Sequence, residues 1–233
     1  MPLITESAAS KQLPDAFQDR KSAPASPLGG PAAADFQPHQ RCTWLRGSIE
    51  ESLIRRQSVR AFALSAVPRS LVLGAIAAAR AAGEAVWPPD RHGGVSMQML
   101  VAAVNVDGLA PGLYTVREAS TDLLTPKSGY LDILREQYAD APVLILICAD
   151  LNQACRDAGQ AGYPATLTRA GTVGYAAWLW AVSAGLAGCV YGGASPDASG
   201  AVRQLDGNLR HLFTVAIGAA AGASPGIEDG SEL

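Results

Sequence analysis

The segment from residue 165 to residue 187 constrains the fold more than any other part of this sequence. It carries one charged side chain, Arg169, and its apolar side chains, among them Tyr175, Trp178 and Trp180, fall on every side of a helix. Such a helix must be buried all round, and one small domain rarely surrounds a helix of this length completely. We therefore expect a long buried helix at the interface of a homodimer.

Shorter segments around this helix predict a sheet covered by helices. Helix-favouring runs predict helices at residues 49–56, 70–82 and 131–138. Apolar runs of strand length predict strands at residues 99–106, 142–149 and 212–217, with residues 112–116 as the hairpin partner of the first. This order predicts an α+β fold with an antiparallel-rich central sheet flanked by helices.

Residues 1–45 differ in composition from the rest of the chain. They are rich in Pro, Ala, Ser and Gly, a composition that buries too little apolar area to offset the entropy lost on ordering. We therefore expect a flexible N-terminal arm. An extension that wraps a partner subunit, anchored by His39 and Trp44, is the alternative. A chain of 233 residues then leaves one folded domain, residues 46–233.

Composition argues against several classes of function. The formal net charge of −3 argues against general nucleic-acid binding. The four cysteines form no Cys-x-x-Cys pair and no histidine stands at metal-ligand spacing, so neither a metal site nor a disulfide framework is indicated. The sequence has no apolar run long enough to span a membrane and no signal-peptide pattern. We expect a cytoplasmic protein with reduced thiols and no membrane contact.

The basic segment after the first predicted helix is a candidate anion site. Arg56 and Arg60 stand four residues apart with Ser58 between them. At a helix end or in a tight turn, their guanidinium groups could converge on one phosphate. Basic residues are also favoured near helix C-termini without any ligand, so a solvated basic helix end is the alternative.

These residues are part of a wider resemblance. Arg-x-Ser-x-Arg, followed two residues later by an aromatic side chain, is similar to the FMN-binding signature that opens nitroreductase-like flavoproteins. Gly-Leu-Ala-Pro-Gly-Leu-Tyr at residues 108–114 resembles a turn of the SagB-type branch, whose members oxidise thiazolines and oxazolines in ribosomal peptides. Gly162-Tyr163, Ala170-Gly171 and residues 184–189 follow that branch's order and spacing, so the resemblance runs from residue 46 to residue 218.

The resemblance implies FMN as cofactor and assigns residues to it. The residues that would grip the phosphate and the ribityl chain are Arg56, Gln57, Ser58 and Arg60. Those in a Gly/Ser-rich turn that would contact the ring and the substrate are Gly94 and Ser96. Those in a loop whose backbone N–H groups would lie beside flavin N5 are Val190, Tyr191, Gly192 and Gly193.

The sequence also departs from the SagB-type pattern. The Lys-Tyr pair that these oxidases carry before the Gly-Tyr step is replaced by residues 157–161, and no basic residue directly follows Gly218. Tyr163 is the remaining candidate for a catalytic proton donor or acceptor. Because a free phenol has a pKa near 10, Tyr163 would need a cation such as Arg169 to act as a base at neutral pH.

Three functions follow from this reading. The first is an FMN-dependent dehydrogenase or oxidase acting on a peptide- or amino-acid-derived substrate in a biosynthetic pathway, beside a partner enzyme of the same cluster. The second is an NAD(P)H-dependent nitro or quinone reductase, which acts on small molecules. The third is a non-catalytic flavin-binding or scaffold subunit.

Overall fold

The computed structural model describes residues 48–88, 95–117, 120–126, 129–193 and 196–222. The predicted arm at residues 1–45 and the predicted contact residue Gly94 lie outside the described residues. The arm and the boundary of the folded domain therefore stay predictions.

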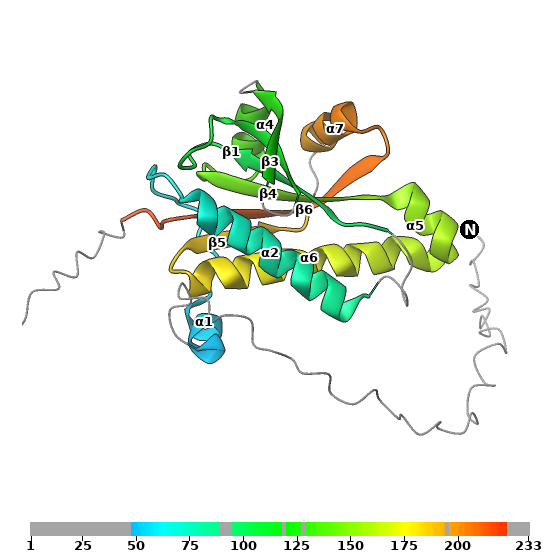
Figure 1. The fold of residues 1–233 in the computed structure, drawn as a ribbon, viewed down its shortest axis with the longest axis horizontal. Coiled ribbons are helices and arrows are strands. Elements are labelled where there is room, and N and C mark those ends of the chain that lie inside the picture. The colour runs from blue at the N-terminus through cyan, green and yellow to red at the C-terminus, as the bar shows by residue number, and fades with distance from the viewer. Residues whose placement is uncertain (1–47, 89–94, 118–119, 127–128, 194–195, 223–233) are drawn as a thin grey trace, which may run out of the picture. The chain divides into compact units, whose positions relative to one another are not determined.

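One antiparallel sheet organises the described residues (Figure 1). Its strands are β1 (Gln98–Ala103), β2 (Gly112–Arg117), β3 (Ser120–Pro126), β4 (Val143–Asp150), β5 (Ala187–Tyr191) and β6 (Leu209–Gly218). They lie in the order β3-β2-β1-β4-β6-β5, and every neighbouring pair is antiparallel. The prediction of an α+β fold with an antiparallel-rich sheet is confirmed.

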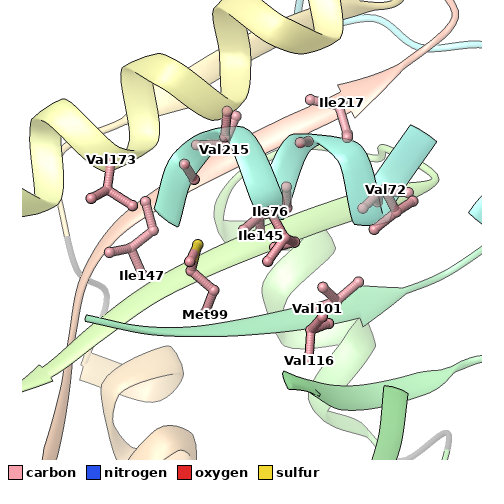
Figure 2. Close-up of a cluster of buried hydrophobic side chains, with 14 of the residues drawn as sticks. Val72, Ile76, Met99, Val101, Val116, Ile145, Ile147, Val173, Val215 and Ile217 are labelled. Atoms are coloured by element: carbon pink, nitrogen blue, oxygen red, sulfur yellow. The ribbon is translucent and has the colours of Figure 1, made fainter. Parts of the chain in front are cut away.

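Helices cover both faces of this sheet. On one face α2 (Arg69–Val86) and α6 (Gly162–Ser183) share a hydrophobic core with the sheet (Figure 2). On the other face α4 (Gly129–Gln137) and α7 (Pro196–Leu205) share a second core with the alternate residues of the same strands. Because both faces are covered, all residues of β4 from Val143 to Ala149 are buried, which explains its continuous apolar sequence.

Two helices flank the long one. α1 (Ile49–Arg55) precedes the basic segment, and α5 (Leu151–Ala158) leads through a short 3₁₀ turn into α6. The predicted strand at residues 99–106 ends at Ala103, because the N–H groups of Val104 and Asn105 both turn to the carbonyl of Pro142. β3, β5, α5 and α7 were not predicted from the sequence, and Val190 and Tyr191, predicted to lie in a loop, are the last two residues of β5.

The long helix differs from its prediction in position and in burial. It begins three residues earlier than predicted and ends at Ser183, since Gly185 adopts φ +86° and the chain enters β5 two residues later. Within one chain Trp178 is buried, but Leu167 and Tyr175 are about 40% exposed. The single domain therefore covers only one side of α6.

Candidate functional site

The basic segment begins where α1 ends. Ser48 caps the helix: its hydroxyl accepts from the Glu51 N–H, and its own N–H donates to the Glu51 carboxylate. The last helical residue is Arg55, and the Arg56 N–H donates to the Ser52 carbonyl at 3.0 Å. Arg56 itself turns the chain into an extended conformation with ψ 105°.

The Arg56 guanidinium packs on the aromatic side chains of α6. Its Cζ atom lies 4.7 Å from the Trp178 ring centroid and 5.9 Å from that of Tyr175. The Arg56 Nε and the Trp178 Nε1 are both buried, and neither has a hydrogen-bond partner among the described residues. The aromatic faces thus hold the cation while hydrogen-bond donors remain unused.

Ser58 joins the site to the edge of the sheet. It forms a parallel bridge with Gly188 of β5, and the Val59 N–H donates to the Gly188 carbonyl at 2.9 Å. A Cβ atom at Gly188 would lie only 2.6 Å from the Trp178 ring and 2.9 Å from the Ala216 carbonyl oxygen. Glycine at this position therefore lets Trp178 lie against the strand, beside Ser58 and beneath Arg56.

Arg60 has different neighbours from Arg56. It is exposed, and the Cys189 thiol and the Tyr191 hydroxyl beside it raise the pKa of Arg60. Trp178 belongs to the core beneath α2 and α6, whereas Tyr191 packs on the core beneath α4 and α7. The two guanidinium groups therefore contact different side chains, Arg56 those of α6 and Arg60 those of β5.

Tyr191 connects this segment to a buried polar network. Burial raises the pKa of Tyr191 to about 12. Its ring lies 5.5 Å from that of Tyr138, whose hydroxyl lies 3.3 Å from Nδ1 of His211. His211 is buried, its Nε2 lies 2.7 Å from the Thr214 hydroxyl, and desolvation lowers the pKa of His211 to about 4. The sequence alone did not predict this network, because the pairing of β5 with β6 and the position of Tyr138 after α4 bring its residues together.

The predicted flavin loop is open on its outer side. A Cβ atom at Gly193 would meet nothing within 4 Å, and one at Gly192 would meet only Phe213 at 3.7 Å. Val190 packs against the core beneath α2 and α6, and Gln57 is exposed. The packing of the chain itself therefore does not require glycine at these two positions.

Tyr163 and Ser96 lie elsewhere in the chain. Tyr163 is in the first turn of α6, half-exposed, and precedes Tyr175 by twelve residues, which corresponds to about 18 Å along a helix. Ser96 is exposed just before β1 and lines a hollow with Arg80 and Arg169. Within one chain neither residue joins Arg56, Tyr175 and Trp178, which form the Arg56 cluster.

The described residues have two further properties. They contain no group of three or more His, Cys, Asp and Glu side chains able to hold a metal ion. None of their helices is long and apolar enough to cross a membrane.

Comparison with known proteins decides the family. The model of the nitroreductase family matches residues 53–218. The chain belongs to the nitroreductase family. A comparison with curated proteins finds no match.

Solved structures of this family share the fold of the chain. A putative nitroreductase from Ralstonia eutropha JMP134 has a TM-score of 0.60 and 20% identity, over 78% of this chain and 86% of that one. A second, from Anabaena variabilis ATCC 29413, has a TM-score of 0.57 and 18% identity, over 74% of this chain and 38% of that one. The NADPH:FMN oxidoreductase from Vibrio harveyi, complexed with NAD+, has a TM-score of 0.50 and 17% identity, over 74% and 69%. At these identities the likeness concerns the fold alone.

Proposed function

We propose that this nitroreductase-family oxidoreductase uses FMN, held by the segment from Arg56 to Arg60. The observation that carries the proposal is the Arg56 guanidinium, which is half-buried on Trp178, has an unpartnered Nε, and forms no ion pair with a described residue. A cation in this state is stabilised by an anion that reaches its free N–H groups.

The neighbouring groups fit the remaining parts of FMN. Ser58 is exposed two residues after Arg56, and its hydroxyl suits the phosphate or the ribityl chain. The open backbone at Gly192 and Gly193 suits the edge of a flat ring. Bound FMN would supply a ring that accepts and returns a hydride, and the chain would hold it, orient it and exclude water.

The reductase reaction is favoured by the position of Tyr163. No histidine or carboxylate among the described residues forms an ion pair or hydrogen bond with Arg56 or Ser58, and Tyr163 lies at the other end of α6. Hydride transfer from NAD(P)H to a stacked ring needs no protein base. We therefore propose an NAD(P)H-dependent nitro or quinone reductase as the simplest activity of this site.

The second candidate, dehydrogenation of a peptide- or amino-acid-derived substrate, is supported by the turn at residues 108–114. Gly108 adopts φ +74°, and the Tyr114 hydroxyl donates to the Ala110 carbonyl at 2.7 Å, so the motif closes on itself at the start of β2. This turn is the feature that resembles the SagB-type branch. A partner enzyme of the same biosynthetic cluster belongs to this second candidate, whereas a cytoplasmic location is part of both.

A homodimer through α6 is part of both proposals. The side of α6 that carries Tyr163, Leu167 and Tyr175 is exposed in one chain. If two copies of α6 pack antiparallel, the first turn of one helix lies beside the last turns of the other. Tyr163 would then approach the Arg56 cluster of the second copy, and its role in catalysis depends on this arrangement.

A visible spectrum followed by anaerobic mixing with NADPH or NADH tests these proposals. Bands of oxidised flavin in the purified protein, or after reconstitution with FMN, are expected. Loss of these bands on mixing supports the reductase, and their persistence supports the dehydrogenase. A chain that takes up no FMN contradicts the proposal and leaves the non-catalytic scaffold as the explanation.

A further inference from the structure

A closed ring of contacts lies behind the basic segment, on the face of the sheet that α4 and α7 cover. Its four members are Tyr191 at the end of β5, Tyr138 just after α4, and His211 and Thr214 of β6. The Tyr191 ring lies 5.5 Å from the Tyr138 ring, with an interplanar angle of 56°. Thr214 stands opposite Tyr191 in the pairing of β5 with β6. Tyr191 therefore has neighbours on this face from both α4 and the adjacent strand.

The buried imidazole of His211 anchors Tyr138 in this ring of contacts. Its Nε2 lies 3.2 Å from the Phe213 carbonyl oxygen and 2.7 Å from the Thr214 hydroxyl. A carbonyl oxygen can only accept, so the proton of the neutral imidazole lies on Nε2, and Nδ1 accepts from the Tyr138 hydroxyl at 3.3 Å. The Tyr138 ring also meets the imidazole edge-on, with centroids 5.6 Å apart and an interplanar angle of 78°. Tyr138 is thus fixed between His211 and Tyr191.

Tyr191 depends on the packing of its ring for its position. Its hydroxyl is buried, yet it has no hydrogen-bond partner of normal geometry among the described residues. Its aromatic contact is the ring of Tyr138, and both side chains pack on the core that α4 and α7 cover. Removing the Tyr138 ring would therefore leave Tyr191 free to move.

Arg60 is the functional group that lies next to Tyr191. Cys189 and Tyr191 are two residues apart on β5, so their side chains lie on the same face of the strand. The Cys189 thiol and the Tyr191 hydroxyl both lie beside the Arg60 guanidinium, although Arg60 is exposed. An exposed arginine side chain loses conformational entropy when a ligand immobilises it, and this loss weakens binding. A guanidinium that is already held in place loses less.

We propose that Tyr138, anchored on His211, is a positioning residue for FMN binding: its ring holds Tyr191, and Tyr191 holds the Arg60 guanidinium. Tyr191 is also the last residue of β5 before Gly192 and Gly193, so the same packing fixes where the predicted flavin loop begins. The inference rests on the proposed FMN site. It assigns no contact with FMN to Tyr138 itself.

Fluorescence titration of the full, flavin-free chain with FMN measures the effect on binding. Tyr138→Leu keeps apolar bulk but removes the ring. It should weaken FMN binding about three- to tenfold, the loss expected when one more arginine side chain must be immobilised on binding. Tyr138→Phe keeps the ring but loses the hydrogen bond to His211, so urea denaturation should show a less stable protein that binds FMN within about twofold of the natural chain.

Tyr130→Leu is the matched control. Tyr130 lies on α4, eight residues before Tyr138, which corresponds to about 12 Å along a helix. This variant loses the same side chain from the same helix region without touching the contact between Tyr138 and Tyr191. It should bind FMN with the affinity of the natural chain.

Alkylation of Cys189 in the flavin-free chain tests the positioning without any cofactor. The Cys189 thiol is buried beside Tyr191, whereas Cys155 is exposed. If Tyr191 is loosened in Tyr138→Leu, iodoacetamide should label Cys189 about threefold faster or more, as followed by peptide mass spectrometry. Tyr130→Leu and Tyr138→Phe should label Cys189 at the natural rate, and Cys155 should react equally fast in every chain.

Three results overturn the inference and leave the proposed FMN site standing: unchanged FMN binding by Tyr138→Leu, an equal loss in Tyr130→Leu, or unchanged labelling of Cys189 in Tyr138→Leu. A natural chain that takes up no FMN overturns the proposed function itself, and the inference with it. Circular dichroism shows whether each variant is folded. If Tyr138→Leu does not fold, Tyr138→Met, whose flexible side chain fills irregular space, replaces it in both measurements.

Discussion

Replacing His211 by Gln should remove a large part of the pH dependence of stability. Desolvation disfavours the charged form of this imidazole, so its pKa in the folded protein is about 4. In the unfolded chain the pKa is that of an ordinary histidine, 6.5. Between these two values the unfolded chain binds more protons than the folded one. The stabilisation is therefore complete above about pH 6.5 and is lost as the pH falls toward 4.

The magnitude follows from the size of the pKa shift. At 1.36 kcal/mol per pKa unit, lowering the pH from 7.5 to 4.5 should cost the natural chain about 2.5 kcal/mol of unfolding free energy through this group. The glutamine of His211→Gln does not titrate. The natural chain's advantage in unfolding free energy over this variant should therefore shrink by about that amount as the pH falls from 7.5 to 4.5.

Urea denaturation at several pH values between 4.5 and 7.5 measures this difference. The stability of His211→Gln at pH 7.5 can be lower for packing reasons, but only the change with pH tests the argument. His39→Gln, in the predicted N-terminal arm, is the matched control and should keep the full pH dependence. If the difference in unfolding free energy between the natural chain and His211→Gln stays constant with pH, the reasoning is refuted.

Four further predictions concern the flavin site and the dimer. Arg56→Ala combined with Arg60→Ala should abolish stoichiometric FMN retention, measured by absorbance, while circular dichroism stays unchanged. Gly188→Ala forces a Cβ atom against Trp178 and should cost about 1–3 kcal/mol in urea denaturation and weaken FMN binding. Leu167→Asp on the exposed side of α6 should give a monomer in sedimentation. Tyr163→Phe should leave flavin reduction by NADPH at its natural rate if the protein is a reductase, whereas a catalytic role predicts a loss of about 10²–10⁴-fold with the substrate.

The sequence predicted the elements whose amino-acid composition is uniformly apolar. β4 is apolar at every position because both faces of the sheet are covered, and α6 stands out because it carries so few charges. β3 was missed because it is an edge strand whose Leu123 and Leu124 are both about half-exposed, so its sequence shows no alternation. α5 is mostly polar, yet its start was readable: the Asp150 side chain accepts from the Gln153 N–H, an ordinary N-cap.

The candidate site shows where local sequence stops being informative. The spacing of Arg56 and Arg60 correctly marks a segment that leaves a helix end, but it does not determine where each guanidinium points. That direction depends on the bridge between Ser58 and Gly188, residues far apart in the sequence, and on the aromatic side chains of α6. His211 carries no local motif at all, and only its neighbours on other elements make it notable.

The basic segment from Arg56 to Arg60 also pairs with the edge of the sheet. β5 is the last strand of the sheet, and Ser58 and Val59 pair with its Gly188. Residues 61–63 then bond to residues 219–221, which follow β6. The free N–H and C=O groups of an exposed edge strand can pair with a strand of another chain. The segment proposed to hold FMN therefore also covers the open edge of β5 at Gly188.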